Sequence, residues 1–455
     1  MKKTIVYTIL TILPIMLFAL ALYYNSAQKN IPDNALKESA QTDIPLSGLI
    51  SISSGDSPVD VPTPTPSPTP MKVDITLMAV GDNLLHPGIV RSGLQEDGSY
   101  DFKFEFEDIS EILKISDIKI INQETPLSGN FRGFSGYPQF NSPTEVADGI
   151  ADSGFNVMLA ATNHAYDNGL DGLIYFADYV KETHPEILLC GIHGSEEASV
   201  STGDAEGNEI NESQKNSNPQ INLLEIKGYT FAILNYTYGP NLETVPKGLD
   251  AHLDLLCPFD EKSRLLDFTK INQKVLSDIR EAKEISDIVI VCPHWGTEYT
   301  PKPSKYQAAW AKEMTEAGAD LIIGAHPHVV QPVEIITSDN GNTALCYYSL
   351  GNYVSTQNTK RSMYEAMAFV TFTDTGSGLA INYKRTGALG MVNHYTSHPL
   401  HFGKIYFVEE YTEELAKSHG ISYWGEGALD LSDILSWDTE LLGDYKLTRD
   451  EVLKP

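Results

Sequence analysis

The fold is decided by a pattern that is clearest at Leu321-Ile-Ile-Gly-Ala-His-Pro-His328, where an apolar run ends in two histidines that flank a proline. The apolar run predicts a short buried β-strand. The two histidines are poor core material, because a buried imidazole needs polar partners. Histidine is also the commonest metal ligand among the side chains. The stretch therefore predicts a strand that carries metal ligands at its end.

An apolar strand that leads into a polar cluster recurs at four other places along the chain. These are Val80-Gly-Asp82, Asn122-Gln-Glu124, Thr162-Asn-His164 and Pro293-His-Trp-Gly296. In open α/β sheets, the groups at the carboxyl ends of the strands converge on one crevice. A mixed set of oxygen and imidazole donors suits zinc, manganese or iron, and suits two ions more easily than one. The pattern therefore predicts a centre for divalent transition metals at these strand ends.

Each polar residue also has an ordinary structural interpretation when it is taken alone. Asp82 could be a turn or cap residue. Glu124 and Asn163 could cap local structure, and His294 beside Trp295 could be a packed core histidine. Because five clusters share one design, we favour a common site, while the role of any single residue stays open.

From residue 73 onward, short apolar runs alternate with amphipathic stretches. Alternation of helices and strands early in the chain, followed by strands late, predicts a mixed α/β (α+β) structure with helices outside the sheet. A polar, aperiodic stretch at 195–220 indicates an insertion. The predicted strands are 75–80, 118–121, 155–160, a pair within 221–236, 288–292, 321–323, 344–348, 366–373 and 379–383, and the predicted helices are 106–116, 144–153, 170–182, 270–284, 305–317 and 412–418.

The residues before 73 predict a membrane anchor and a spacer. Lys2 and Lys3 precede an uncharged apolar run over residues 5–24, and about 20 such residues cross a bilayer as a helix. A cleaved secretory signal is the alternative interpretation. The two lysines favour a cytoplasmic N-terminus, so we expect a single-pass cell-membrane protein whose main domain is extracytoplasmic.

We divide the chain into four parts on composition. Residues 1–27 form the anchor or signal, and 28–71 form a Pro/Ser/Thr-rich stalk that is extended and semi-rigid. Residues 72–400 form the main domain, with its motifs within 73–357. Residues 401–455 form an acidic C-terminal extension.

The overall charge limits the partners. A formal net charge of −29 over 455 residues makes nucleic acid an unexpected partner, because phosphate backbones need basic surfaces. An anionic polymer would need bound metal or local cations, and four cations close in sequence to the predicted ligands are Lys302, Lys305, Lys360 and Arg361. The four cysteines include no CxxC pair, so a thiolate zinc site is not indicated.

The ordered set of motifs resembles the CapA family of poly-γ-glutamate capsule synthesis proteins. The resemblance covers residues 73–357, about three fifths of the chain. It rests on Gly81-Asp82, Asn122-x-Glu124-x-Pro126, Thr162-Asn163-His164-x-x-Asp167, His294-Trp-Gly-x-Glu298-Tyr299, Gly324-Ala-His326-Pro-His328-x-x-Gln331 and Ser349-Leu-Gly-Asn352-Tyr353. Such proteins are taken to share the calcineurin-like metallophosphoesterase fold, so the resemblance implies a β-sandwich flanked by helices.

The resemblance also implies a role for each polar residue. His164 would be the catalytic acid beside the substrate, with Glu298 and Asn352 as additional site residues. The implied metal ligands are Asp82 and His328 for the first ion, Glu124 for both ions, and Asn163, His294 and His326 for the second ion.

The first motif departs from the superfamily pattern. That pattern is Asp-x-His, whereas position 84 of this chain is Leu. His86 lies two residues further on and is the candidate replacement. Without a replacement, the first ion would be held weakly and the site could work with one ion.

Three functions remain open on the sequence alone. The first is a metal-dependent hydrolase of phosphoesters or of polyglutamyl amides, with two ions of manganese, zinc or iron. The second is a non-catalytic accessory that binds, exports or anchors poly-γ-glutamate, or a related anionic polymer, beside a membrane synthase complex. The third is a cell-wall interaction protein that retains a metal site. The chain has no G-x-x-x-x-G-K loop, so we do not expect it to energise polymerisation alone.

Overall fold

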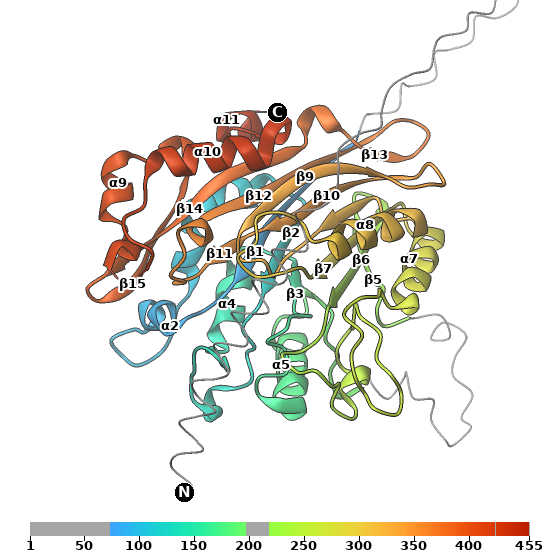
Figure 1. The fold of residues 1–455 in the computed structure, drawn as a ribbon, viewed down its shortest axis with the longest axis horizontal. Helices are drawn as coiled ribbons and strands as arrows, with labels where there is room; N and C mark the ends of the chain where they lie inside the picture. The colour runs from blue at the N-terminus through green and yellow to red at the C-terminus, as the bar shows by residue number, and fades with distance from the viewer. Residues whose placement is uncertain (1–72, 197–217, 424, 455) are drawn as a thin grey trace, which may run out of the picture. The chain divides into compact units, whose positions relative to one another are not determined.

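The structure, a computed structural model, describes residues 73–196, 218–423 and 425–454. Within these residues two β-sheets pack face to face and helices cover their outer faces (Figure 1). The predicted mixed α/β fold with outer helices is therefore confirmed. The predicted anchor and stalk, and most of the predicted insertion at 195–220, lie outside the described residues.

The first sheet is parallel on one side and antiparallel on the other. Its parallel strands are β1 (Asp74–Asn83), β2 (Ile118–Gln123), β3 (Val157–Leu159) and β4 (Leu188–Cys190), with the short β11 (Asn352–Val354) beside the end of β1. Its antiparallel strands are β12 (Tyr364–Asp374), β13 (Leu379–Ile381), β14 (Gly387–Ser397) and β15 (Leu400–Phe407). All parallel strands therefore end on one side of the sheet.

The second sheet has a parallel centre and antiparallel edges. Its order is β5 (Asn222–Ile226), β6 (Tyr229–Thr237), β7 (Ile288–His294), β8 (Leu321–Ile323), β10 (Thr343–Leu350) and β9 (Val330–Thr337). The predicted hairpin between β5 and β6 turns at Lys227 and Gly228, both in left-handed backbone (φ 52° and 85°). Two consecutive positive φ values are typical of a type I′ hairpin turn.

The central strands are continuous apolar runs in the sequence because their side chains are buried on both faces of the sheet. In β1, Ile75, Leu77 and Ala79 lie in the layer between the sheets, whereas Met78 and Val80 pack under the outer helices. Parallel strands that are covered on both faces show this pattern instead of simple alternation. The four cysteines are buried and free.

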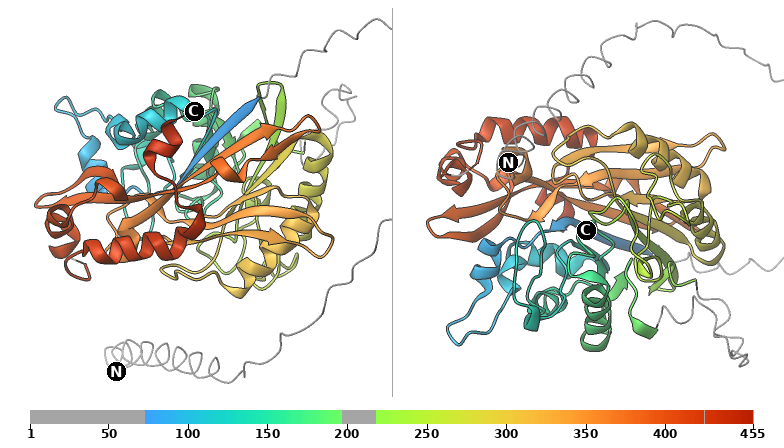
Figure 2. Two further views of the ribbon diagram at one scale, coloured as in Figure 1. Left: turned by 90° about the horizontal axis from the view of Figure 1, so that it is seen from above. Right: turned by 60° about the horizontal axis from the view of Figure 1, so that its bottom comes forward.

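The outer helices divide between the two sheets. Those that follow first-sheet strands are α2 (Pro87–Gly93), α3 (Ser110–Ile115), α4 (Glu145–Asp152) and α5 (Gly169–Thr183), and those of the second sheet are α7 (Gln273–Ile285) and α8 (Lys305–Ala317). Figure 2 shows the cyan and green helices on one side of the paired sheets and the yellow helices on the other. Within the described residues, no helix is long and apolar enough to span a bilayer.

The C-terminal residues pack against the same sheets. Residue 400, where we predict the main domain to end, is the first residue of β15. The helices α9 (Glu413–Ser418), α10 (Leu431–Leu442) and α11 (Arg449–Leu453) follow it. Helix α10 contacts β9, β12 and β14, so it fills the inner face of the first sheet beyond the edge of the second.

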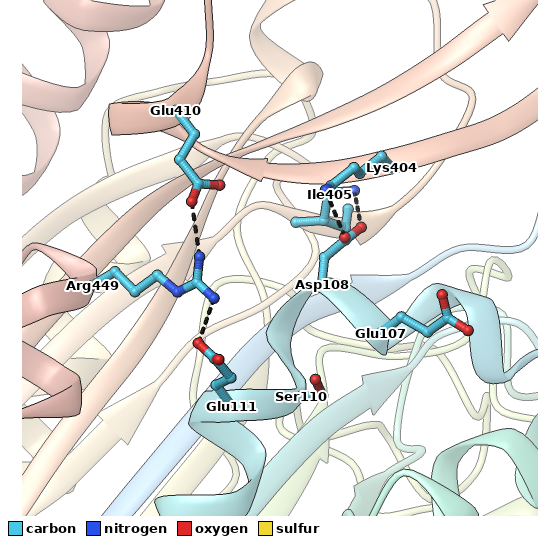
Figure 3. A pocket seen from close by; sticks show the side chains of 8 residues that line it. All are labelled: Glu107, Asp108, Ser110, Glu111, Lys404, Ile405, Glu410 and Arg449. Carbon is cyan, nitrogen blue, oxygen red and sulfur yellow. Dashed lines mark hydrogen bonds and ion pairs between the residues drawn. The ribbon is translucent and has the colours of Figure 1, made fainter.

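A set of ion contacts fastens α11 and β15 to the N-terminal half of the domain. Arg449 donates to Glu111 (2.5 Å) and to Glu410 (2.8 Å), and Lys404 pairs with Asp108 (3.2 Å). Figure 3 shows these side chains around a pocket of about 280 Å³. Because the carboxylates and cations of this pocket pair with one another, we interpret it as a structural contact that joins the C-terminal segments to the N-terminal half of the domain.

Candidate metal centre

The polar residues predicted at the strand ends converge in the structure. Parallel pairing places Asp82 of β1 opposite Asn122 of β2 on one side and Asn352 of β11 on the other. A bridge between His294 and Ala325 brings the end of β7 beside the end of β8. The carboxyl ends of strands from both sheets therefore meet, as the position of ligands in α/β sheets leads one to expect.

Two groups of donor atoms share Glu124. One group is Asp82, Glu124 and His328, the other is Glu124, His294 and His326, and within each group the donor atoms lie within 4.8 Å of one another. A third group joins Glu298 to the same two histidines, His326 and His328. This arrangement matches the ligand sets that the family resemblance implies, with Glu124 between them. The metal-binding role itself stays a prediction.

Glu124 lies between two imidazoles without a hydrogen bond. Its Oε1 is 3.7 Å from Nε2 of His294 and 3.7 Å from Nε2 of His328. Neither carboxylate oxygen has a hydrogen-bond partner, although the residue is only 1% exposed. Burial raises the pKa of Glu124 well above its usual value, and only His328 opposes that shift. A cation would satisfy these two oxygens, so the donors fit the metal that the fold implies.

The surrounding imidazoles differ in charge. Burial and the neighbouring imidazoles lower the pKa values of His294 and His326 well below the ordinary value, so both are neutral. A neutral imidazole offers the lone pair that a metal needs, and Nδ1 of His326 has no hydrogen-bond partner. Burial also acts to lower the pKa of His328, but Glu124 and Asp82 outweigh it and raise that pKa to about 9.

Asp82 fixes the two histidines of the His-Pro-His stretch. Its Oδ2 accepts from the backbone N–H of His326 (3.2 Å) and lies 3.0 Å from Nδ1 of His328, while Oδ1 accepts from Asn122 (2.7 Å). Both histidines have left-handed backbone, with φ values of 96° and 56°. Such conformations cost about 1–3 kcal/mol each, and they persist where the surroundings over-determine them. The hydrogen bonds of Asp82 supply part of that constraint.

A close backbone approach beneath the stretch requires glycine at position 324. A Cβ atom there would lie 2.1 Å from the carbonyl oxygen of Tyr348 and 2.4 Å from Nε1 of Trp295. The indole Nε1 of Trp295 donates to that same carbonyl (2.9 Å). The buried Trp295 thus supports the strand end that carries the histidines, so the sequence neighbours of His294 and His326 are part of the scaffold.

Asn163 and His164 take different positions. Oδ1 of Asn163 lies 2.8 Å from Nε2 of His294, which places Asn163 beside the second donor group. Nδ1 of His164 lies 2.7 Å from Oδ2 of Asp167, so this nitrogen carries the proton and Nε2 is free to exchange one. His164 belongs to none of the three donor groups. The capping interpretation of Asn163 fails, because the next helix, α5, begins after Asn168.

His86 does not join the donor groups found in the described residues. Its Nδ1 accepts from the backbone N–H of Thr356 (3.3 Å), and its ring packs edge-on against Phe140 (5.5 Å between centroids). Burial lowers its pKa to about 4. Leu84, which stands where the superfamily pattern has histidine, is a buried apolar residue. The structure instead places Asn352 at the first group, with Oδ1 3.0 Å from Nδ1 of His328.

Several residues to which the sequence assigned no role support the site. Asn122 holds Asp82, Asn241 accepts from Asn163 (3.1 Å), and Gln357 accepts from Asn352 (3.0 Å). Asn122 stands in a predicted strand-end cluster, and its place two residues before Glu124 indicates a shared role, because alternate positions of a strand share a face. Gln357 gave no sequence signal, since it follows the matched motifs and has no apolar run before it.

In the described residues two sheets pack face to face, helices cover their outer faces, and imidazole and carboxylate groups gather at the strand ends, which is the arrangement that the family resemblance implies. A family model described as "Bacterial capsule synthesis protein PGA_cap" matches residues 76–210 and 207–357, which is more than half of the chain. The chain therefore belongs to the bacterial capsule synthesis protein family.

Two named relatives are similar over the same region. "PGA biosynthesis protein CapA" of Bacillus subtilis (strain 168) is 27% identical over 277 residues, covering 60% of this chain and 62% of that protein. "Capsule biosynthesis protein CapA" of Bacillus anthracis is 26% identical over 310 residues, covering 67% of this chain and 66% of that protein. The match thus spans less than two thirds of the length of either relative.

Solved structures give a weaker likeness. A calcineurin-like phosphoesterase, YfkN from Bacillus subtilis, is 12% identical with a TM-score of 0.33, covering 68% of this chain and 88% of that one. A hypothetical protein from Thermus thermophilus is 12% identical with a TM-score of 0.34, covering 70% of this chain and 99% of that one. Likenesses at these TM-scores add nothing to the geometry described above.

Proposed function

We propose that this chain is a metal-dependent hydrolase of capsule polymer biosynthesis that uses two divalent transition metals, manganese, zinc or iron. The observation that carries the proposal is Glu124, a buried carboxylate whose two oxygens have no partner and which lies between His294 and His328. A side chain in that position is costly unless a cation satisfies it. The family membership and the names of both Bacillus relatives support the link to capsule biosynthesis.

The residues divide into two sets around Glu124. Asp82 and His328 would hold one ion with it, and Asn163, His294 and His326 would hold the other. When bound, the ions would polarise an oxygen of the scissile group and lower the pKa of the attacking water. Asp82 also orients His328, because the Nδ1–H of that ring points to Oδ2 and leaves Nε2 toward Glu124.

His164 supplies the proton for the leaving group. Asp167 holds the Nδ1–H of the ring, so the exchangeable proton resides on Nε2. In hydrolysis of a phosphodiester, the water oxygen bonds to phosphorus while the bond from phosphorus to the leaving oxygen breaks. The leaving oxygen takes the proton from Nε2 of His164, and the proton lost by the water passes to solvent. A positioned general acid of this kind contributes about 10²–10⁴-fold to the rate.

The proposal is tested on the full-length protein by metal analysis and by activity. We expect stoichiometric transition metal after purification, hydrolysis of bis(p-nitrophenyl) phosphate, and loss of that activity on chelation with recovery on adding Mn²⁺ or Zn²⁺. A protein with no bound metal refutes the proposal. Metal binding with no turnover of any ester or polyglutamyl amide would favour the second candidate, an accessory that binds the polymer beside a membrane synthase.

We also propose that the domain is held outside the cell by the N-terminal apolar run, as a single-pass membrane protein. The support is the charge-free run at 5–24 behind Lys2 and Lys3, which has the length and flanking charge of an outward-facing anchor. Protease treatment of intact protoplasts should digest the domain, with a cytoplasmic protein left intact as the control. A full-length protein that survives this treatment, or that fractionates with the cytosol, contradicts the proposal.

A further inference from the structure

A groove with apolar walls lies in the segment that links β6 to α7. Its volume is about 640 Å³, and its lining includes Pro258, Phe259, Leu265, Leu266 and Phe268. Leu265 is 50% exposed and Phe268 is 39% exposed, so both present carbon surface to solvent. A concave surface of this size that is lined mainly by apolar side chains is typical of a ligand site. The proposed reaction uses none of these residues.

Tyr238 connects this groove to the metal centre. Its ring centroid lies 4.8 Å from that of His326 and 5.9 Å from that of Phe268. Three residues further along the chain, Oδ1 of Asn241 accepts from Asn163 (3.1 Å), which lies beside the second donor group. One stretch of chain after β6 therefore contacts the donors and leads to the groove. A molecule whose reacting group lies at the donors can reach the groove with a chain attached to that group.

Backbone hydrogen bonds hold the walls of the groove in place. The N–H of Asp260 donates to the carbonyl of Leu265 (2.9 Å), and the N–H of Asp267 donates to the carbonyl of Pro258 (2.8 Å). The exposed side chain of Leu265 thus projects from a fixed backbone. A site whose shape exists before binding needs little ordering when a ligand enters, which favours affinity.

The charged groups of the groove are already engaged. Nζ of Lys270 lies 2.7 Å from Oδ2 of Asp267. Asp260 accepts from the backbone N–H groups of Lys262 (3.1 Å) and Ser263 (2.8 Å). Lys270 is the one cation among the described residues that line the groove. What the groove offers to a ligand is therefore mainly apolar surface.

The cations that we predicted for an anionic polymer lie elsewhere. The described residues that line the groove include none of the four, which are Lys302, Lys305, Lys360 and Arg361. Arg361 stacks over Trp437 (5.0 Å), and Lys305 lies over its neighbour Tyr306 (4.9 Å). A polyanion such as poly-γ-glutamate would thus meet no unpaired cation among the described residues of the groove, and its carboxylates would lack a counter-charge there.

We infer that the groove binds an aliphatic chain of the substrate, so that the molecule hydrolysed is a phosphodiester with a long alkyl group on the oxygen that stays on phosphorus. A linear chain fits the arrangement, because the groove begins one aromatic ring beyond His326. Burial of the chain against Leu265 and Phe268 would remove apolar surface of both partners from water. The inference rests on the proposed hydrolase function and narrows its substrate class.

The test compares two diesters of equal charge. These are p-nitrophenyl octyl phosphate, used below its micellar concentration, and p-nitrophenyl methyl phosphate. Water attacks phosphorus and p-nitrophenolate leaves in both, so the alkyl phosphate is the other product. A fully buried CH₂ group contributes about fourfold in binding. Because the groove is open on one side, we expect kcat/KM of the full-length, metal-loaded protein to favour the octyl ester by about tenfold. The preference should reside mainly in KM, since the groove takes no part in bond breaking.

Variants of one residue test whether the groove is the cause. Leu265→Gln places an amide in the apolar wall and should reduce the preference to about threefold. Leu265→Met keeps an apolar side chain of similar size and should retain the preference. The control Leu435→Gln changes a leucine of α10 that is 43% exposed, and should leave the preference unchanged. Bound metal, measured in each variant, should stay at the wild-type value.

Each other outcome has a distinct meaning. A wild type that hydrolyses both esters equally well, or a Leu265→Gln variant that keeps the full preference, overturns the inference while the hydrolase function stands. An equal loss of preference in Leu435→Gln also overturns it, because the effect would then not depend on the groove. Loss of bound metal in Leu265→Gln does so as well, since Leu265 would then support the donors. A metal-loaded wild type that hydrolyses neither ester overturns the proposed function itself.

Discussion

Replacing Glu124 with methionine should stabilise the metal-free protein and abolish metal binding. Glu124 is 1% exposed and both of its oxygens lack a hydrogen-bond partner. An unsatisfied buried polar group costs about 1–3 kcal/mol, and methionine has a similar length without polar atoms. Metal-free Glu124→Met should therefore exceed the metal-free wild type in free energy of unfolding by about 1–3 kcal/mol.

The excess in free energy of unfolding of metal-free Glu124→Met over metal-free wild type should grow as pH rises. Burial raises the pKa of Glu124 in the folded state, so above its unfolded value of about 4.3 the unfolded chain releases a proton that the folded chain retains. The wild type thus loses stability as pH rises above that value, whereas the variant lacks this dependence. Metal should reverse the order, since an ion at about 1,000 times its dissociation constant stabilises the wild type alone by about 4.1 kcal/mol.

Denaturant unfolding of chelator-treated full-length protein at pH 6 and pH 8, with and without Zn²⁺, measures all of these differences. Glu284→Met, a change at an exposed position of α7, serves as the matched control and should alter neither the stability nor the metal response. Metal-free Glu124→Met that is less stable than wild type at both pH values would contradict this expectation. That result would mean that the Glu124 carboxylate contributes to the folded state without a cation.

Three further predictions concern histidines. His326→Ala and His328→Ala should each contain less metal than wild type by elemental analysis, because each removes a donor. The control His398→Ala changes an exposed histidine of the turn before β15 and should retain its metal. Equal metal content in all three variants would contradict the assigned ligands. His164→Ala should keep its metal, and its kcat should fall by about 10²–10⁴-fold. The kcat of Asp167→Asn should also fall, because Oδ2 of Asp167 holds the Nδ1–H of His164. Loss of metal in His164→Ala would make His164 a ligand. Burial lowers the pKa values of His394 to about 4 and of His419 to about 3, so the unfolded chain binds these protons first and stability should fall as pH drops below about 6.5. The loss of stability between pH 7 and pH 5 should be smaller in His419→Gln than in wild type, and equal losses in both would exclude this cause.

Many of the strands and helices can be predicted from the sequence because the patterns that indicate them are local. The runs at Ile288–His294 and Leu321–Ile323 are buried on both faces, and such continuous apolar segments are recognisable without knowledge of their partners. The elements that were missed are short or paired at long range. Strand β11 has three residues and exists because it pairs with the end of β1, about 270 positions earlier in the chain. Strands β14 and β15 were unpredicted because strand preference depends on the neighbouring strands.

Some features of the candidate site also follow from local sequence, and others follow from long-range packing. The sequence alone determined which side chains stand at the strand ends, because an apolar run that stops at a polar residue is a local property of the chain. How these side chains group, with Glu124 shared between two sets, follows from the packing of the two sheets and has no local signal. The tertiary structure also decided that Nδ1 of His86 accepts a hydrogen bond from Thr356, a residue 270 positions away, outside those sets. A donor set within 4.8 Å depends on the register and twist of two sheets, and those follow from packing over the whole domain.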